Sequence, residues 1–207
     1  MAIAFTDILK ARRRIASCVL KTPMRRSPAL ERVAGVPVLL KCEHHQTTGS
    51  FKLRGATNAV LSLSDDERTR GVVTFSTGNH GRALSHAAIA AGTRAVVCMS
   101  ELVPQNKVDA IRALGADIRI VGRSQDEAER AAGELARVEG LSPVSPMDDA
   151  AVIAGQGTLG MEVMEDAPEL ETVLVPLSGG GLISGVALAV KTLSPGTRII
   201  GVGSKSC

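Results

Sequence analysis

Residues 72–81, VVTFSTGNHG, join a short β-branched run to a polar loop that contains glycine. The run predicts a buried strand, and the alanine-rich residues that follow, up to Gly92, predict a helix. A strand, a glycine loop and a helix in this order favour binding of a phosphate or carboxylate, because free N–H groups at the beginning of a helix point toward the ligand. This stretch therefore predicts both an α/β fold and an anion site.

Strand-like runs recur along the chain, and helical periodicity separates each from the next. This alternation is typical of a parallel sheet wrapped by helices, so we expect an α/β fold. The clearest helix covers residues 124–139, where Ser124 and Glu127 form a capping box. The further strand-like runs are RAVVCM, DIRIV, TVLVPL and RIIGV.

The run TVLVPL leads into a second loop, SGGGL, at residues 178–182. Three consecutive glycines allow a ligand to approach the backbone closely, because no Cβ stands in the way. The dinucleotide motif G-x-G-x-x-G would require glycine where Ser184 stands, and no G-x-x-x-x-G-K-[ST] segment occurs. Dinucleotides and Walker-type nucleotides are therefore disfavoured, and an ordinary tight turn remains the alternative for either loop alone.

Lys52 lies in SFKLRG, residues 50–55, between Phe51 and the expected beginning of a helix. The helix dipole and the apolar neighbour both disfavour the charged form of this amine, which favours the neutral nucleophile. A phosphate site without nucleotide motifs, combined with such a lysine, points to pyridoxal phosphate, whose aldehyde needs an amine. A lone lysine at this position would otherwise be an exposed surface residue.

Composition restricts the class of protein. The 207 residues carry 24 Lys and Arg against 21 Asp and Glu, interspersed along the chain, while Trp and Tyr are absent, so a stacking surface for nucleic acid is nearly excluded. The four cysteines form no C-x-x-C pair and no histidines stand at zinc-ligand spacing, so we expect neither disulfides nor a metal site. The N-terminal apolar run is too short for a signal peptide and no segment is long enough to span a bilayer, so we expect a cytoplasmic protein without a membrane partner.

A domain boundary is expected in GLSPVSPMDD, residues 140–149, where two prolines and small polar residues interrupt the pattern. We expect two lobes that pack directly against each other. Residues 1–43 and 146–207 would form a large cofactor-binding domain, and residues 44–145 a smaller α/β domain.

Four motifs, SFKLRGA, STGNHG, SPMDDAAVIAGQGT and PLSGGGLISG, occur in the order and combination of a known family. The chain resembles the fold-type II pyridoxal-phosphate enzymes, in the branch of threonine and serine dehydratases and serine racemase, from the N-terminus to about Val202. Within this branch it looks most like the hydroxyectoine utilisation dehydratases. The resemblance implies a two-lobed fold and an ammonia-lyase that converts a small β-hydroxy amino acid, such as threonine, serine or 3-hydroxyaspartate, into a 2-oxo acid and ammonia.

The resemblance also implies roles for individual residues. Lys52 would condense with the cofactor aldehyde and then exchange the proton at the substrate α-carbon, with Phe51 packed near the cofactor. Asn79 would hydrogen-bond the ring hydroxyl. Ser76 and His80 would seat the substrate carboxylate, with helix capping by Ser76 and a structural hydrogen bond from His80 as alternatives. The phosphate would bind the backbone N–H groups of Ser178, Gly179, Gly180, Gly181 and Leu182.

Thr77 stands where racemases of this branch have serine and many dehydratases have alanine. Its hydroxyl leaves an amino-acid racemase open as an alternative, although β-branching restricts χ1. Relatives continue well beyond Val202, and many carry a metal-binding glutamate where this chain has Gly203. We therefore expect an incomplete large domain and no such metal site, with a catalytically inactive truncated homologue as a further alternative. An intact protein would form a homodimer.

Overall fold

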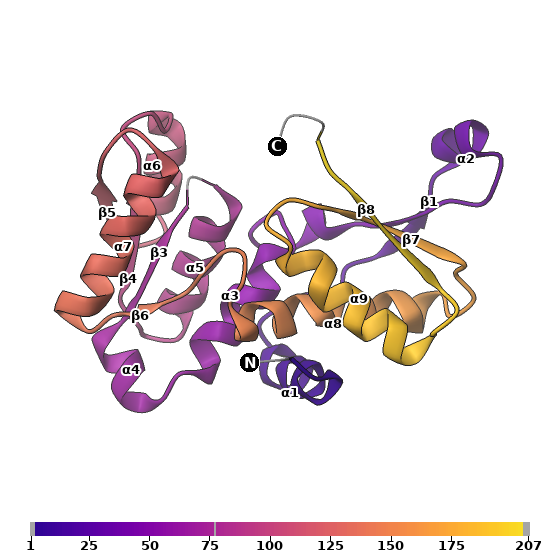
Figure 1. Ribbon diagram of the computed structural model, residues 1–207, viewed down its shortest axis with the longest axis horizontal. Helices are drawn as coiled ribbons and strands as arrows, with labels where there is room; N and C mark the ends of the chain where they lie inside the picture. The colour runs from indigo at the N-terminus through magenta and orange to yellow at the C-terminus, as the bar shows by residue number, and fades with distance from the viewer. Residues whose placement is uncertain (1–2, 77, 205–207) are drawn as a thin grey trace.

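The computed structural model describes residues 3–76 and 78–204, and its helices and strands alternate as the sequence predicted (Figure 1). The N-terminal part is a helix followed by a short antiparallel hairpin and three further helical segments. The hairpin strands are joined through a helix that begins with a proline and ends at Gly35, in the left-handed region with φ +71°. These elements are α1 (Phe5–Ile15), β1 (Met24–Arg26), α2 (Pro28–Ala34), β2 (Leu39–Lys41), the 3-10 helix η1 (Glu43–His45), α3 (Lys52–Ser62) and α4 (Asp65–Arg70).

A parallel sheet of four strands occupies the middle of the chain, with the strand order β5-β4-β3-β6. Each pair of sequential strands is connected through a helix, as parallel pairing requires. The expected capping box is present, since Ser124 Oγ accepts from the Glu127 N–H at 3.2 Å. The elements are β3 (Val72–Phe75), α5 (Asn79–Ala90), β4 (Ala95–Met99), α6 (Gln105–Arg112), β5 (Asp117–Ile120), α7 (Gln125–Glu139) and β6 (Ser142–Pro143).

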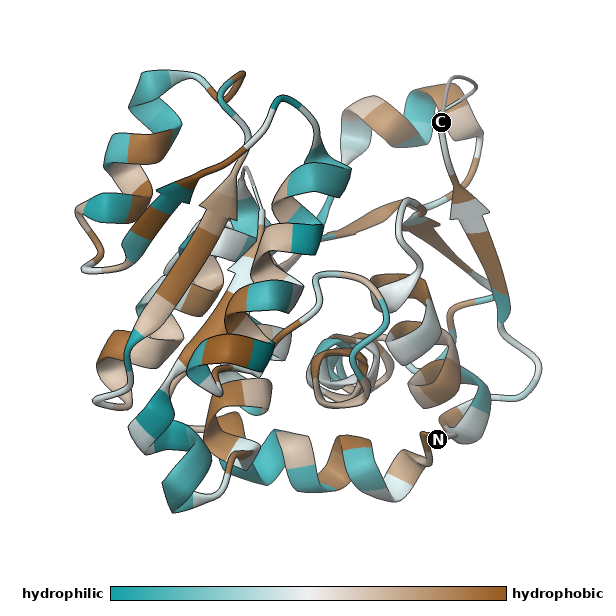
Figure 2. Ribbon diagram, turned by 60° about the vertical axis from the view of Figure 1, so that its left-hand side comes forward, coloured by the Kyte–Doolittle hydropathy of each residue, from teal (hydrophilic) through white to brown (hydrophobic). Residues whose placement is uncertain are grey.

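Helices cover both faces of this sheet. Val72 belongs to a buried cluster with residues of α3, α5 and α6, whereas its neighbour Val73 belongs to a separate cluster with residues of α7. Successive residues of a strand point to opposite faces, so a strand covered on both sides is apolar throughout. The apolar strands between partly polar helices follow this rule (Figure 2). The α/β fold class predicted from the sequence is confirmed.

The C-terminal part forms a second parallel unit, in which β7 and β8 pair through the crossover helix α9. The glycine-rich segment AGQGTLG is the interior of the long helix α8, where its glycines allow close helix packing. A Cβ on Gly155 would lie 2.6 Å from the Arg54 carbonyl oxygen of α3, and one on Gly160 would lie 2.9 Å from the Val186 carbonyl oxygen of α9. The elements are α8 (Ala150–Asp166), β7 (Thr172–Pro176), α9 (Gly181–Leu193) and β8 (Arg198–Val202).

All strands of the four-stranded sheet fall within residues 72–143. The division of the chain into lobes at 43/44 and 145/146 stays a prediction. Within the described residues, no helix is both long enough and apolar enough to cross a membrane.

A fully buried guanidinium joins α3 to α8 and η1. Arg54 Nε and Nη2 donate to the two carboxylate oxygens of Glu43 at 2.9 and 2.8 Å, and Nη1 and Nη2 donate to those of Glu162 at 2.6 and 2.9 Å. Burial acts to lower the pKa of Arg54, but the hydrogen bonds from Glu43 and Glu162 outweigh it and raise the pKa. Both contacts are bidentate, which is the strongest geometry for such pairs.

Replacement of this arginine should destabilise the fold strongly. Arg54→Met leaves two carboxylates without their buried partner, and we expect a loss of about 3–5 kcal/mol in the free energy of unfolding. Urea unfolding measures this loss of free energy. The matched control is Arg68→Met, because Arg68 pairs with Asp65 at the surface and should cost less than about 1 kcal/mol. Equal losses of stability in the two variants would contradict the structural role of the buried Arg54 ion pairs.

Candidate functional site

Lys52 is the first residue of α3, and its side chain is half-buried. Its Nζ donates to the Pro146 carbonyl oxygen at 2.8 Å and lies 5.5 Å from the centroid of the Phe51 ring. Burial lowers the pKa of Lys52, because desolvation penalises the charged form. Burial therefore shifts the predicted amine toward its neutral, nucleophilic form.

The segment that accepts this hydrogen bond also packs on the glycine loop. Met147 follows Pro146, and its side chain fills the space where a Cβ on Gly179 would stand, 2.7 Å from its sulfur. A Cβ on Gly181 would lie 2.6 Å from the Met147 carbonyl oxygen. The backbone contact excludes a side chain at Gly181, whereas one at Gly179 would have to displace the Met147 side chain. Residues 146–147 thus contact the lysine on one side and the glycine loop on the other.

The glycine loop ends at the first residue of α9. Gly180 adopts φ +87°, in the left-handed region that favours glycine, and nothing lies within 4 Å of the position of a Cβ there. The first N–H groups of an α-helix have no acceptor within the helix, and the helix dipole favours an anion beside them. Ser178 is exposed and Leu182 is partly buried. The arrangement of these residues suits a phosphate, and the phosphate contact of residues 178–182 stays a prediction.

The first polar loop connects β3 to α5. Ser76 Oγ accepts from the Gly78 N–H at 3.3 Å, while the Ser76 N–H donates to the Cys98 carbonyl oxygen at 3.2 Å. Asn79 begins α5 with an exposed side chain. Thr77, whose hydroxyl leaves an amino-acid racemase open as an alternative, lies outside the described residues. Ser76 therefore organises its own loop, and the predicted ligand contacts of Ser76 and Asn79 stay predictions.

His80 is buried beneath this loop, with 2% of its surface exposed. Its Nε2 lies 3.2 Å from the Val144 carbonyl oxygen, which also accepts from Thr74 Oγ1 at 2.8 Å. Burial and, less strongly, the nearby charge of Lys52 lower the pKa of His80 to about 4, although the hydrogen bond to Val144 acts to raise it. His80 is therefore neutral at pH 7. The structural hydrogen bond considered as its alternative role is present, and its contact with substrate stays a prediction.

One short segment, residues 144–147, lies against Lys52, His80, Gly179 and Gly181. From the sequence, this segment is expected to be a domain boundary, and no part in the site is predicted for it, because the atoms involved are mainly backbone carbonyl oxygens, which every residue type carries. The two prolines of SPVSP, residues 142–146, are the signal that could have drawn attention to it, since proline restricts the backbone at such a junction.

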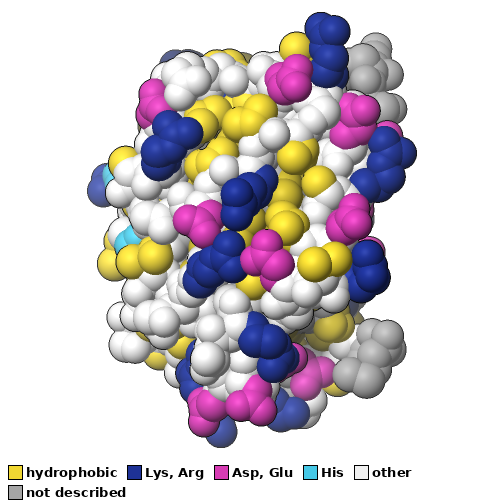
Figure 3. Space-filling model, turned by 90° about the vertical axis from the view of Figure 1, so that its left-hand side faces the viewer, with side chains coloured by type: hydrophobic (Ala, Val, Ile, Leu, Met, Phe, Trp, Pro, Cys, Tyr) yellow, Lys and Arg dark blue, Asp and Glu magenta, His cyan; other side chains and the backbone are white. Residues whose placement is uncertain are grey.

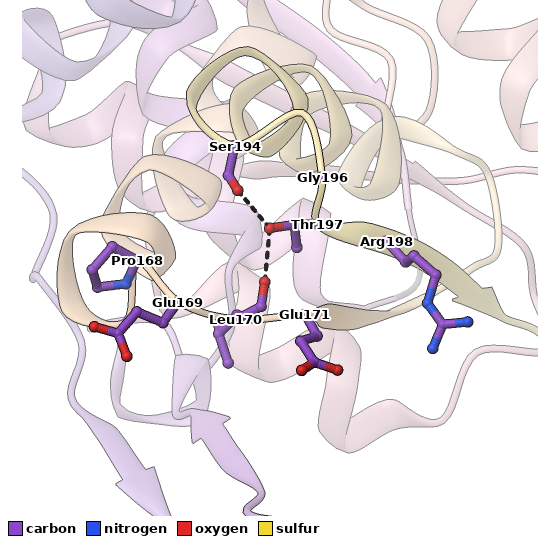
Figure 4. A pocket seen from close by; sticks show the side chains of 8 residues that line it. All are labelled: Pro168, Glu169, Leu170, Glu171, Ser194, Gly196, Thr197 and Arg198. Carbon is purple, nitrogen blue, oxygen red and sulfur yellow. Dashed lines mark hydrogen bonds between the residues drawn. The ribbon is translucent and has the colours of Figure 1, made fainter.

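A surface pocket of about 430 Å³ lies elsewhere, at the beginnings of β7 and β8 (Figure 4). Thr197 Oγ1 donates to the Leu170 carbonyl oxygen at 2.7 Å and lies 2.8 Å from Ser194 Oγ, so the Thr197 hydroxyl is already paired. None of the predicted site residues lines this pocket. Its lining residues are Pro168, Glu169, Leu170, Glu171, Ser194, Gly196, Thr197 and Arg198.

Charges of both signs are mixed on one face of the molecule (Figure 3). On the described part of the face shown in Figure 3, basic and acidic side chains are interspersed around apolar ones. Arg94, for example, pairs with both Asp117 and Glu139, at 2.9 and 2.7 Å.

A family model described as pyridoxal-phosphate dependent enzyme matches residues 15–207. A putative threonine dehydratase of Sinorhizobium fredii is 56% identical over 200 residues, which make up 97% of this chain and 60% of that protein. The L-threonine ammonia-lyase of Thermotoga maritima is 43% identical over 204 residues, 99% of this chain and 51% of that protein.

Solved structures of a serine racemase and a threonine deaminase also match this chain. Maize serine racemase matches with a TM-score of 0.93 at 37% identity, over 97% of this chain and 61% of that one. Threonine deaminase isoform 2 from Solanum lycopersicum matches with a TM-score of 0.91 at 39% identity, over 96% and 54%. The chain thus spans a little more than half the length of these relatives.

The contact between Gly181 and Met147 predicts a strong effect of an added methyl group. Gly181→Ala should displace residues 146–147 and cost about 1–3 kcal/mol of stability, as overpacking does. It should also weaken cofactor binding, measured by absorbance titration with pyridoxal phosphate. The matched control is Gly133→Ala in α7, where nothing lies within 4 Å and helix propensity should add about 0.5–1 kcal/mol. Unchanged cofactor affinity in Gly181→Ala would contradict the prediction that residues 178–182 bind the cofactor phosphate.

The low pKa of His80 predicts a pH-dependent stability. In the unfolded chain histidine takes up a proton near pH 6.5, whereas folded His80 does so only near pH 4. Stability is therefore lost as the pH falls from about 6.5 toward 4. Between pH 7 and 5, the wild type should lose about 2 kcal/mol more than His80→Gln in urea unfolding. Parallel losses in the two proteins would show that His80 titrates normally.

Proposed function

Because the chain belongs to the family of pyridoxal-phosphate-dependent enzymes, we propose that it acts as a dehydratase, or ammonia-lyase, on a small β-hydroxy amino acid. The products would be a 2-oxo acid and ammonia. The observation that carries this proposal is the Lys52 amine, half-buried and hydrogen-bonded to the Pro146 carbonyl oxygen beside the glycine loop.

The residues present fit the family's cofactor. Lys52 offers an amine with a lowered pKa for its aldehyde, and the loop from Ser178 to Leu182 offers backbone N–H groups for its phosphate. Gly180 leaves open space where any other residue would carry a Cβ. Phe51 beside Lys52 supplies an apolar surface, and Asn79 would reach the ring hydroxyl. When bound, pyridoxal phosphate supplies the electron sink that stabilises negative charge at the substrate α-carbon.

The chain's own residues then hold and move protons. With its pKa lowered, Lys52 Nζ would take the proton from the substrate α-carbon, and the β-hydroxyl would take up a proton and leave as water. His80 stays neutral at pH 7, so it adds no positive charge that would lower the basicity of Lys52. Ser76, in the loop, and His80, in the first turn of α5, would seat the substrate carboxylate. Hydrogen-bond donors that are fixed before the substrate binds need no reorganisation during the reaction. This preorganisation is usually the largest single contribution to the rate enhancement of an enzyme.

We also propose a substrate, a metabolic role, a cellular location and an oligomeric state for this protein. The names of the relatives favour threonine or serine as substrate, and the resemblance to hydroxyectoine utilisation dehydratases suggests 3-hydroxyaspartate and a role in hydroxyectoine catabolism. A cytoplasmic location and a homodimer complete the proposal.

An amino-acid racemase is the second candidate. The likeness to maize serine racemase and the hydroxyl of Thr77 favour it, because a hydroxyl on the opposite face of the substrate could return a proton there. Product analysis with L-serine, L-threonine and threo-3-hydroxyaspartate separates the two functions. Release of 2-oxo acid and ammonia supports the dehydratase, whereas exchange of enantiomers without ammonia supports the racemase. Neither product, with no absorbance band from bound cofactor, would support a catalytically inactive homologue.

Lys52→Ala should abolish turnover and the covalent attachment of the cofactor. With no Trp or Tyr in the chain, the bound chromophore is easily followed by absorbance. Chemical reduction followed by peptide mass analysis should place the cofactor on Lys52 in the wild type and nowhere in the variant. Lys107→Ala, at an exposed position of α6, is the control and should keep the attachment. A covalently bound cofactor in Lys52→Ala would overturn the proposed function.

A further inference from the structure

Three side chains with metal-binding atoms converge at the 3-10 helix η1. The thiol of Cys42 and the imidazoles of His44 and His45 bring one ligand atom each within 4.8 Å of one another. Cys42 is buried, whereas both histidines are exposed, so the thiol forms the floor of the cluster and the rings its open side. The ring centroids of the two histidines are 4.3 Å apart. The site described above uses none of these three residues.

The local backbone explains the convergence. In a 3-10 helix the side chains at positions i and i+3 eclipse each other, which places His45 over Cys42. The His45 N–H donates to the Cys42 carbonyl oxygen at 3.0 Å, and the Cys42 N–H donates to the Pro23 carbonyl oxygen at 3.0 Å. Sequence spacing alone did not reveal this cluster, because C-E-H-H is shorter than the usual ligand spacing of zinc sites.

The turn is also fixed from its other side. Glu43, between Cys42 and the histidines, directs both carboxylate oxygens to Arg54, at 2.9 and 2.8 Å. Glu43 is thus engaged as the partner of a buried guanidinium and is not a further ligand. The backbone that carries the three donors is therefore held in place before any ion binds, which lowers the entropic cost of binding.

We propose that Cys42, His44 and His45 form a binding site for a divalent transition-metal ion of the zinc class. One thiolate and two imidazoles are the donors that zinc and cobalt accept in tetrahedral sites, and three protein ligands leave a fourth position for water or an external ligand. Binding releases the thiol proton of Cys42 to solvent as the metal–sulfur bond forms, and no oxidant or reductant is required.

The required movement is small. Metal–nitrogen bonds of about 2.0–2.1 Å and a metal–sulfur bond of about 2.3 Å at tetrahedral angles put ligand atoms about 3.3–3.6 Å apart. The present separations of up to 4.8 Å close to this range when the exposed imidazoles rotate toward Cys42. The Cys42 thiol lies 3.4 Å from the Leu40 carbonyl oxygen and would exchange this weak hydrogen bond for the metal.

Titration of the purified protein with Co²⁺ tests the proposal without any measurement of activity. We expect one equivalent to bind, with thiolate-to-cobalt charge-transfer absorption and tetrahedral d–d bands, and Zn²⁺ to displace it. Thermal unfolding should shift upward with Zn²⁺, since a ligand of the folded state stabilises it. His44→Gln and His45→Gln should each weaken Co²⁺ affinity at least tenfold, and Cys42→Ser should abolish the charge-transfer band.

Matched variants serve as controls. Cys18→Ser removes an exposed free thiol, and His86→Gln removes a histidine of α5, so neither should change the spectrum or the affinity. If Cys42→Ser fails to fold because its side chain is buried, the two exposed histidine variants still decide. Absence of cobalt binding, or equal binding in wild type, His44→Gln and His45→Gln, would overturn the proposal.

Discussion

The buried guanidinium of Arg54 is the interaction on which the site most depends. It follows Lys52 by two residues in α3, and its two bidentate pairs attach this helix to Glu43 of η1 and Glu162 of α8. Lys41 reaches the same Glu162 at 2.8 Å and adds the hairpin to the network. A charge removed from water is tolerated only when it is paired in this way. The network therefore fixes the beginning of α3, and with it the position of the amine.

Close backbone contact supplies the second constraint. Gly155 lets α8 touch α3, and Gly185 of α9 sits against Gly157 of α8, where an added Cβ would lie 2.6 Å from the Gly157 nitrogen. Because α9 begins at the glycine loop, the packing of α9 on α8 also sets where that loop stands. The segment with Pro146 and Met147 then joins the loop to the lysine. The predicted phosphate site and the amine are thus both positioned by helices that pack on α8.

Some residues could be interpreted from the sequence because their signal is local. The capping box of Ser124 and Glu127 is predicted from residues three positions apart, and it is present in the structure. Arg54 gave no such signal, since an arginine after a lysine in a helix is usually exposed. Its partners lie 11 and 108 residues away, and only the folded chain shows that it is buried.

The sequence by itself determined the α/β class, the glycine loops, the cofactor and the lysine that would bind it, because periodicity, β-branched runs and motif order are properties of neighbouring residues. Only the tertiary structure decided what surrounds that lysine. Pro146 lies 94 residues from Lys52, and the contact that buries the amine runs through a backbone carbonyl oxygen. The same holds for Cys42, His44 and His45, whose convergence depends on one turn of 3-10 helix. Contacts between distant residues follow from how helices pack, and no local pattern encodes them.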